Sequence, residues 1–244
     1  MLNKLKSLLS VARHAFHSLP SWRVGVSVVL SFLFLSACTD EEEGAWDPYA
    51  NWQTRNAAWF EQLGDSARTA IARAKAQYGD DWENHCEWRM FKSLRRSPGY
   101  NSRNLVDSIC VKVVKSGNRQ GDNVASPLYT DTVRVDYRGY LMNTTYEKAD
   151  GSQYDQMLIF DQSYFGEFNE QTCAPAKMAV GGTVEGFCTA LQYMVPGDIW
   201  MVYIPQELAY GESSTGDVPA YSTLLFKLHL AAVYHPGTKV PAWK

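Results

Sequence analysis

The chain has 244 residues, which is enough for one or two domains. Hydrophobic residues make up 45% of it and charged residues 20%, a balance that is typical of a globular protein and excludes a disordered or fibrous one. The formal net charge of −3 argues against nucleic acid as a partner. All 26 acidic residues lie at or after Asp40, so the segment before it is basic and the remainder lacks a polybasic membrane-binding patch.

The first 37 residues have the pattern of an export signal. A basic leader precedes residues 24–37, an uncharged apolar run that is shorter than the roughly 20 residues a membrane-spanning helix needs. The run ends in Leu35-Ser36-Ala37, and together with Cys38 these residues resemble a bacterial lipobox, in which the peptide is cut before a cysteine that then carries lipid. We expect residues 1–37 to be a lipoprotein signal peptide and Cys38 to be lipidated. The alternative is an uncleaved anchor with a chance cysteine.

Residues 38–45 are expected to form an acidic tether. Four consecutive acids start at Asp40 and resemble the export tag that sends some Gram-negative lipoproteins to the outer cell surface. Like charges also repel and extend a chain, so a disordered tether explains the same residues. Both interpretations predict an outer-membrane lipoprotein, either on the cell surface or facing the periplasm.

Residues 46–104 are expected to form a mainly helical extension. Apolar residues recur at helical spacing over residues 46–80, Gly64 interrupts the pattern, and Gly79 marks its end. A strand is expected within residues 87–97. The region is rich in tryptophan: Trp46, Trp52, Trp59, Trp82 and Trp88. These rings either stack on sugars or pack against the next domain, and their helical spacing favours packing. The extension either dimerises the protein or spaces it from the membrane.

Residues 105–236 have β-rich character, and residues 237–244 read as an irregular tail. Strands are expected over residues 108–115, 131–141 and 199–204 and from Leu224 to Leu230. Alternation places Asp136 on the outward face of its strand, and it places His229 on an outward face where it is expected in solvent. Residues 184–194 have helical spacing. One short helix among antiparallel strands predicts an α+β fold.

Four further cysteines follow the lipobox: Cys86, Cys110, Cys173 and Cys188. An oxidising compartment allows disulfides, and four cysteines permit three complete pairings. Cys173 with Cys188 is the first pairing to test, while buried free thiols are favoured for at least two of the four. The spacing has no CxxC, so no metal site is expected. The sequence contains none of the motifs of serine hydrolases, nucleotide-binding loops or zinc peptidases, so neither covalent chemistry nor a cofactor is expected.

The C-terminal half carries an ordered series of short motifs. They are Asp136-Tyr137-Arg138-Gly139, Phe160-Asp161, Val184-Glu185-Gly186-Phe187, Ile204-Pro205, Ala209-Tyr210-Gly211, Val218-Pro219 and Leu224-Leu225-Phe226. In this order and spacing they resemble the FKBP-type peptidyl-prolyl cis-trans isomerases, over about residues 105–235. The resemblance is greatest to lipoprotein members that carry a helical N-terminal region. It implies an FKBP-like twisted antiparallel β-sheet wrapped around one short α-helix, with an apolar proline-binding pocket between them.

The resemblance also implies roles for individual residues. Phe187 would be the pocket floor, where many members have tryptophan, and Tyr137, Phe160 and Phe226 would be aromatic walls. The expected catalytic set is completed by Asp161 at the pocket edge, the backbone N–H of Val184 and the Tyr210 hydroxyl. Met178 and Val218 are expected to bind substrate. Each of these aromatics could instead be an ordinary core residue.

The function implied is isomerisation of X-Pro bonds in exported proteins at the outer membrane, with proline-containing polypeptides as partners and the Cys38 lipid as membrane anchor. The alternative is a binding module or chaperone of the same fold with little turnover. Two stretches are longer than in compact members: residues 143–157, which suggest a hairpin or loop, and residues 161–181. Three short motifs, at Ser66, Ser108 and Thr132, also resemble an O-glycosylation signal.

Overall fold

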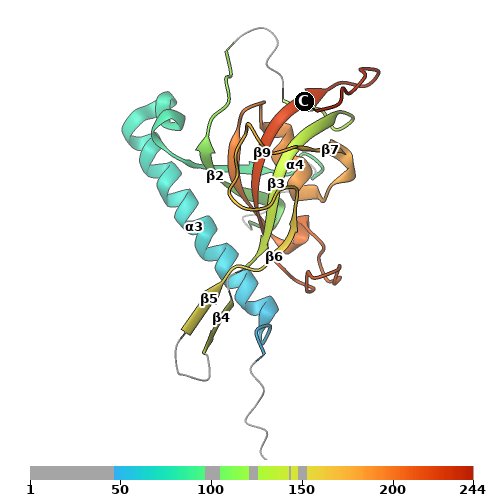
Figure 1. Cartoon of the computed structure of the whole chain (residues 1–244). Coiled ribbons are helices and arrows are strands. Elements are labelled where there is room, and N and C mark those ends of the chain that lie inside the picture. Colours follow the sequence, from blue (N-terminus) through green and yellow to red (C-terminus); the bar gives the residue numbers. More distant parts are fainter. Residues whose placement is uncertain (1–46, 97–104, 121–125, 143, 148–152, 244) are drawn as a thin grey trace, which may run out of the picture. The chain divides into compact units, whose positions relative to one another are not determined.

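The structure, a computed structural model, describes residues 47–96, 105–120, 126–142, 144–147 and 153–243 (Figure 1). The expected signal peptide, the lipobox cysteine, the acidic tether and Trp46 lie outside the described residues. From Pro48 onward the chain forms one compact unit. No helix in this described part is long and apolar enough to cross a bilayer.

The described chain contains two α-helices, nine strands and four short 3-10 turns. In order they are α3 (Trp52–Tyr78), η1 (Gly79–His85), β1 (Trp88–Lys92), η2 (Leu105–Asp107), β2 (Ser108–Lys115), β3 (Thr132–Leu141), β4 (Thr144–Glu147), β5 (Gln153–Gln156), β6 (Ile159–Gln162), β7 (Ala176–Ala179), η3 (Val180–Gly182), α4 (Glu185–Tyr193), β8 (Ile199–Ile204), η4 (Gln206–Leu208) and β9 (Leu224–Tyr234).

Seven of these strands form one antiparallel sheet. Its order is β1-β2-β8-β9-β3-β6, and β7 also pairs with β3. The helix α4 packs on one face, against the core that includes Val111, Val202 and Leu228. The expected α+β fold, with a twisted antiparallel sheet around one short helix and a preceding helix, is confirmed. The described residues of the insert at 143–157 include two antiparallel strands, because β4 pairs with β5 in a separate two-stranded sheet (Figure 1).

The long helix α3 packs on the opposite face of the sheet. Trp59 lies edge-on to Tyr203 of β8, with ring centroids 6.0 Å apart. The indole Nε1 of Trp52 donates to Ser222 Oγ over 2.9 Å, and the side chain is only 6% exposed. Packing, and not a sugar platform, therefore accounts for Trp52. The helix starts six residues later than predicted, because a turn with Asn51 in the left-handed region precedes it.

The helix α3 continues through Gly64, where the sequence suggested an interruption. A Cβ at this position would lie 2.2 Å from Leu105 Cδ1. Glycine therefore allows Leu105 of η2 to pack directly against the helix. The three O-glycosylation-like positions differ in exposure: Ser66 is exposed on α3, whereas Ser108 and Thr132 are half-buried in strands.

The prediction that His229, on an outward strand face like Asp136, points into solvent is wrong. Both are buried, and His229 Nδ1 lies 3.0 Å from Asp136 Oδ2. The long segment between β6 and β7 covers this face, since Phe168 packs on the His229 ring at a centroid distance of 5.1 Å. Both faces of β3 and β9 are thus buried at this point.

All four described cysteines are free, so the suggested pairing of Cys173 with Cys188 is not formed. The Cys188 side chain is buried on α4, where its thiol contacts Gln192 Oε1 of the same helix at 3.4 Å. Cys110 is also buried, and this burial raises the pKa of its thiol to about 12. The expectation of at least two buried free thiols is confirmed.

Candidate active site

Four aromatic rings from four different elements meet on the α4 side of the sheet. The rings of Phe187 and Phe226 lie 5.0 Å apart at 87°, and those of Phe160 and Phe226 lie 5.4 Å apart at 81°. Tyr137 stands edge-on to Phe187 at 6.1 Å. Edge-to-face pairs are a preferred aromatic geometry, with centroids about 4.5–7 Å apart. The four side chains therefore form a continuous, preorganised apolar wall.

A glycine of β3 makes this packing possible. Gly139 lies opposite Phe226 of β9 and Asp161 of β6 in the sheet register. A Cβ at Gly139 would lie 2.7 Å from Phe160 Cζ and 2.7 Å from Phe226 Cε1. Sequence reasoning placed Gly139 within a motif but gave it no role, although a glycine inside an alternating strand often marks a close approach.

Asp161 is exposed at the edge of the aromatic wall and accepts a hydrogen bond from the Tyr137 hydroxyl over 3.0 Å. Burial raises the pKa of Tyr137 to about 12, and the hydrogen bond to Asp161 and its charge act in the same direction. The Tyr137 phenol therefore stays protonated at neutral pH, and the bond fixes its ring against Phe187.

A second hydroxyl belongs to Tyr210, which follows η4. The pKa of Tyr210 is raised, first by burial and then by the negative charge of Asp161. The side chain is half-buried against the core. Its turn is closed by the Gly211 N–H, which donates to the Gln206 carbonyl over 3.0 Å, and Gly211 has a φ of +59° that favours glycine. Tyr210 thus presents a protonated phenol as a potential donor.

Val184 is the N-cap residue of α4, and its backbone N–H has no hydrogen-bond partner among the described residues. The helix approaches the sheet closely, because a Cβ at Gly186 would lie 2.3 Å from Ile204 Cγ2. This close approach buries Phe187 to 4% exposure at the base of the aromatic wall.

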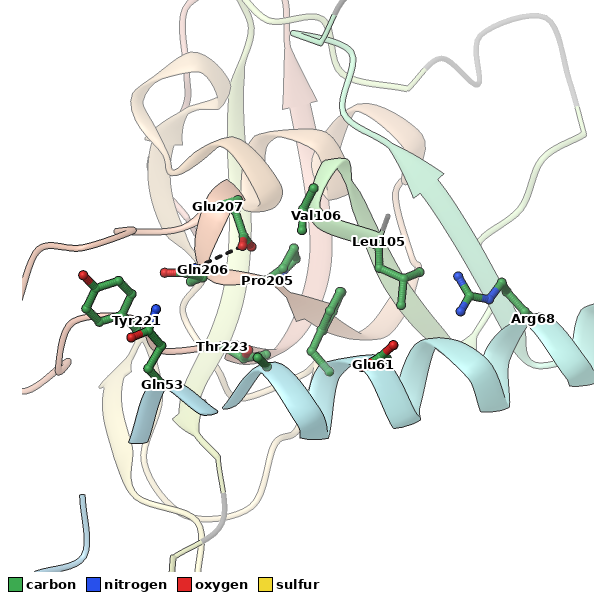
Figure 2. A pocket seen from close by; sticks show the side chains of 12 residues that line it. Gln53, Glu61, Arg68, Leu105, Val106, Pro205, Gln206, Glu207, Tyr221 and Thr223 are labelled. Carbon is green, nitrogen blue, oxygen red and sulfur yellow. Dashed lines mark hydrogen bonds between the residues drawn. The ribbon is translucent and has the colours of Figure 1, made fainter. Parts of the chain in front are cut away.

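The two expected substrate-binding residues both belong to the core that includes Phe187 and Phe226 or pack against it. Met178 on β7 is half-buried against the core, and Val218 is 3% exposed. A groove of about 590 Å³ runs past Phe160 and Val218 and is also lined by Tyr49, which precedes α3. Eight of the nine site residues expected from the sequence thus belong to the hydrophobic core or pack against it, and Asp161 joins them through its hydrogen bond with Tyr137. A separate cavity of about 250 Å³ lies between α3 and η4 and is lined by none of them (Figure 2).

The chemistry available at this cluster is binding and polarisation. It combines an apolar aromatic wall with two protonated hydroxyls, one free backbone N–H and one exposed carboxylate. No group of three or more potential metal ligands occurs in the described ranges. Such a surface can hold an apolar ring and donate hydrogen bonds to a carbonyl next to it.

Comparisons with known proteins show similarity to one enzyme family. A family model described as FKBP-type peptidyl-prolyl cis-trans isomerase matches residues 125–231. The FKBP-type 22 kDa peptidyl-prolyl cis-trans isomerase of Escherichia coli is 38% identical over 116 residues, which are 47% of this chain and 46% of that protein. The Outer membrane protein MIP of Legionella longbeachae is 34% identical over 153 residues, which are 62% of this chain and 54% of that protein.

The chain thus spans about half the length of these curated relatives. Among solved structures, a peptidyl-prolyl cis-trans isomerase from Pseudomonas syringae pv. tomato is 25% identical and has a TM-score of 0.38. The match covers 71% of this chain and 94% of that one.

Proposed function

Because the chain belongs, through residues 125–231, to the FKBP-type peptidyl-prolyl cis-trans isomerase family, we propose that it isomerises X-Pro bonds in exported polypeptides. The observation that carries the proposal is the convergence of Tyr137, Phe160, Phe187 and Phe226 into one edge-to-face wall. These four residues are spread between positions 137 and 226 of the sequence, so they come together only when the chain folds.

The mechanism needs no covalent step. Rotation about a peptide bond loses resonance, with a barrier of about 18–20 kcal/mol. A twisted amide is less dipolar than a planar one, so a pocket that excludes water favours the twisted form. Only interactions that are stronger in the transition state accelerate the reaction. A 10⁴-fold acceleration requires about 5.5 kcal/mol at roughly 1.36 kcal/mol per tenfold.

In this proposal the proline ring rests on Phe187, between the walls of Tyr137, Phe160 and Phe226. The Val184 N–H and the Tyr210 hydroxyl donate to carbonyl oxygens of the substrate and hold the chain on either side of the twisting bond. Asp161 fixes the Tyr137 ring through the 3.0 Å hydrogen bond. Met178 and Val218 bound the pocket and contact the residues that flank the proline.

The proposed setting is the outer membrane, with the lipid on Cys38 as anchor and exported proteins as clients. The lipobox and the acidic segment support it, and one relative is named an outer membrane protein. Uncatalysed prolyl isomerisation takes tens to hundreds of seconds and can limit folding. A folding helper at this location would shorten that step.

One observation favours a second candidate, a binding module with little turnover. Phe187 is smaller than the tryptophan of many family members and lacks an indole N–H. A smaller floor that still binds proline but stabilises the twisted amide less would give a chaperone of the same fold.

A peptide assay tests the proposal. We expect the purified chain to accelerate isomerisation of a short Leu-Pro peptide, and Phe187→Ala to lose at least tenfold in kcat/KM. Because removing a buried phenylalanine costs about 3–5 kcal/mol of stability, Phe187→Leu serves as a milder second variant. Phe168→Ala is the matched control, since this ring packs on His229 at the opposite face of the sheet. A folded wild type without acceleration, but with measurable peptide binding, would favour the binding module.

A further inference from the structure

An acidic residue stands at the entry of the helix that carries the pocket floor. Glu185 is the first residue of α4, next to Val184 and two residues before Phe187. Its side chain is only 18% exposed. A helix N-terminus favours negative charge, but a mostly buried carboxylate also needs hydrogen-bond partners to offset its desolvation.

Both partners of Glu185 come from the segment that follows β1, about 90 residues earlier in the chain. Ser93 Oγ donates to Glu185 Oε1 over 2.6 Å, and Ser93 is 2% exposed. Arg96 makes a forked contact, with Nε 2.9 Å from Oε1 and Nη2 3.3 Å from Oε2. This segment lies outside residues 125–231, the part of the chain that matches the family model.

The same guanidinium reaches a second element. Arg96 Nη2 donates to the backbone carbonyl of Glu207 over 2.9 Å. Glu207 belongs to η4, the turn that leads to Tyr210, and Figure 2 shows it beside Gln206. One arginine therefore ties the start of α4 to the turn before Tyr210.

We propose that Arg96, supported by Ser93, is a positioning residue for the isomerase site. It fixes α4 relative to η4 and thereby sets the spacing between the Val184 N–H and the Tyr210 hydroxyl. This inference rests on the proposed function, because those two groups are its substrate donors. Lysine cannot replace the arginine, since an ammonium lacks the planar fork that serves two acceptor groups at once.

The proposal predicts that removal of the Arg96 side chain has different effects on catalysis and on the free energy of unfolding. The Arg96 side chain is 42% exposed, so water can take its place beside Glu185 when it is removed, and Ser93 Oγ still donates to Glu185 Oε1. Displacement of a substrate-binding group by about 1 Å can cost up to 100-fold in rate. Arg96→Ala is therefore expected to affect catalysis more than folding.

Steady-state kinetics give the first test. We expect Arg96→Ala to lower kcat roughly tenfold with KM within about twofold, because the donors it positions act mainly in the transition state. Arg96→Lys should not restore kcat. Arg95→Ala is the matched control, since its guanidinium faces the Tyr129 ring at 6.0 Å and not Glu185. Equal kinetics for the Arg96→Ala and Arg95→Ala variants would overturn the inference.

Amide hydrogen exchange gives a test that does not depend on activity. The Cys188 N–H donates to the Val184 carbonyl over 2.9 Å, and the Gly211 N–H closes the turn after η4. Arg96→Ala should speed exchange at both amides by about tenfold, and Arg95→Ala at neither. Unchanged exchange refutes the positioning role. A wild type that shows no isomerisation refutes the proposed function instead, while the exchange result still decides whether Arg96 couples the two elements.

Discussion

The substitution Gly139→Ala tests whether the aromatic wall is built around a missing side chain. The new Cβ would lie 2.7 Å from both Phe160 Cζ and Phe226 Cε1, whereas ordinary contacts begin at 3.4 Å. Each ring must therefore retreat by about 0.7 Å, or the strand must shift by a similar amount. Overpacking of this kind costs about 1–3 kcal/mol, and the smaller backbone entropy of alanine returns about 0.5–1 kcal/mol.

We therefore expect Gly139→Ala to lower the free energy of unfolding by about 1–2 kcal/mol, measured by urea denaturation with an unchanged m-value. Isomerisation should fall by tenfold or more, because the displaced rings are the proposed pocket walls. Gly182→Ala is the matched control, since its Cβ would meet nothing closer than 3.7 Å and its φ is not positive. If the two alanine variants have the same stability and the same kcat/KM, the wall does not depend on Gly139.

Three further predictions concern protonation, packing and thiol reactivity. With the pKa of Tyr137 at about 12 and that of Tyr210 raised, isomerase activity should stay level between pH 7 and about 10. Because the folded pKa values are raised, the stability linked to these phenols is complete below about pH 10 and is lost as pH rises toward 12. Trp52→Phe removes the buried bond to Ser222 and should cost about 1–3 kcal/mol, measured by urea denaturation. The buried Cys110 thiol should react with a thiol reagent only after unfolding, as followed by mass spectrometry of labelled peptides.

Each of these predictions has a contrary result. A loss of activity centred near pH 10 would mean that the phenols titrate as free tyrosines do. Trp52→Phe at wild-type stability would show that the indole bond is replaced by water. Labelling of native Cys110 within minutes would show that β2 opens easily.

The local sequence pattern correctly predicts several structural elements and fails for others. The strands at Ser108–Lys115 and Ile199–Ile204 have the predicted bounds, because apolar runs between turn residues need no distant information. His229 was misplaced because alternation assumes one solvated face. The sequence shows that the segment before β7 is long, but not that it folds back over this face.

Some residues of the candidate site could likewise be predicted from the sequence, and others could not. The ordered motifs indicate Tyr137, Phe187 and the other site residues, because the family resemblance supplies their tertiary relation. The partners of Glu185 could not be predicted, since Ser93 and Arg96 are about 90 residues distant and belong to no motif. Their contact depends on where the β1 segment lies in the folded protein.

The sheet order has a consequence for the route by which the protein acquires its structure. The strand β9, last in sequence among those described, lies between β8 and β3, and β3 and β9 are separated by some 90 residues. Pairings of such high sequence separation form slowly. Until residues 224–234 arrive, β3 and β8 have no common neighbour and the two halves of the sheet stay apart. A chain emerging N-terminus first would therefore complete this sheet only after residues 224–234 are released.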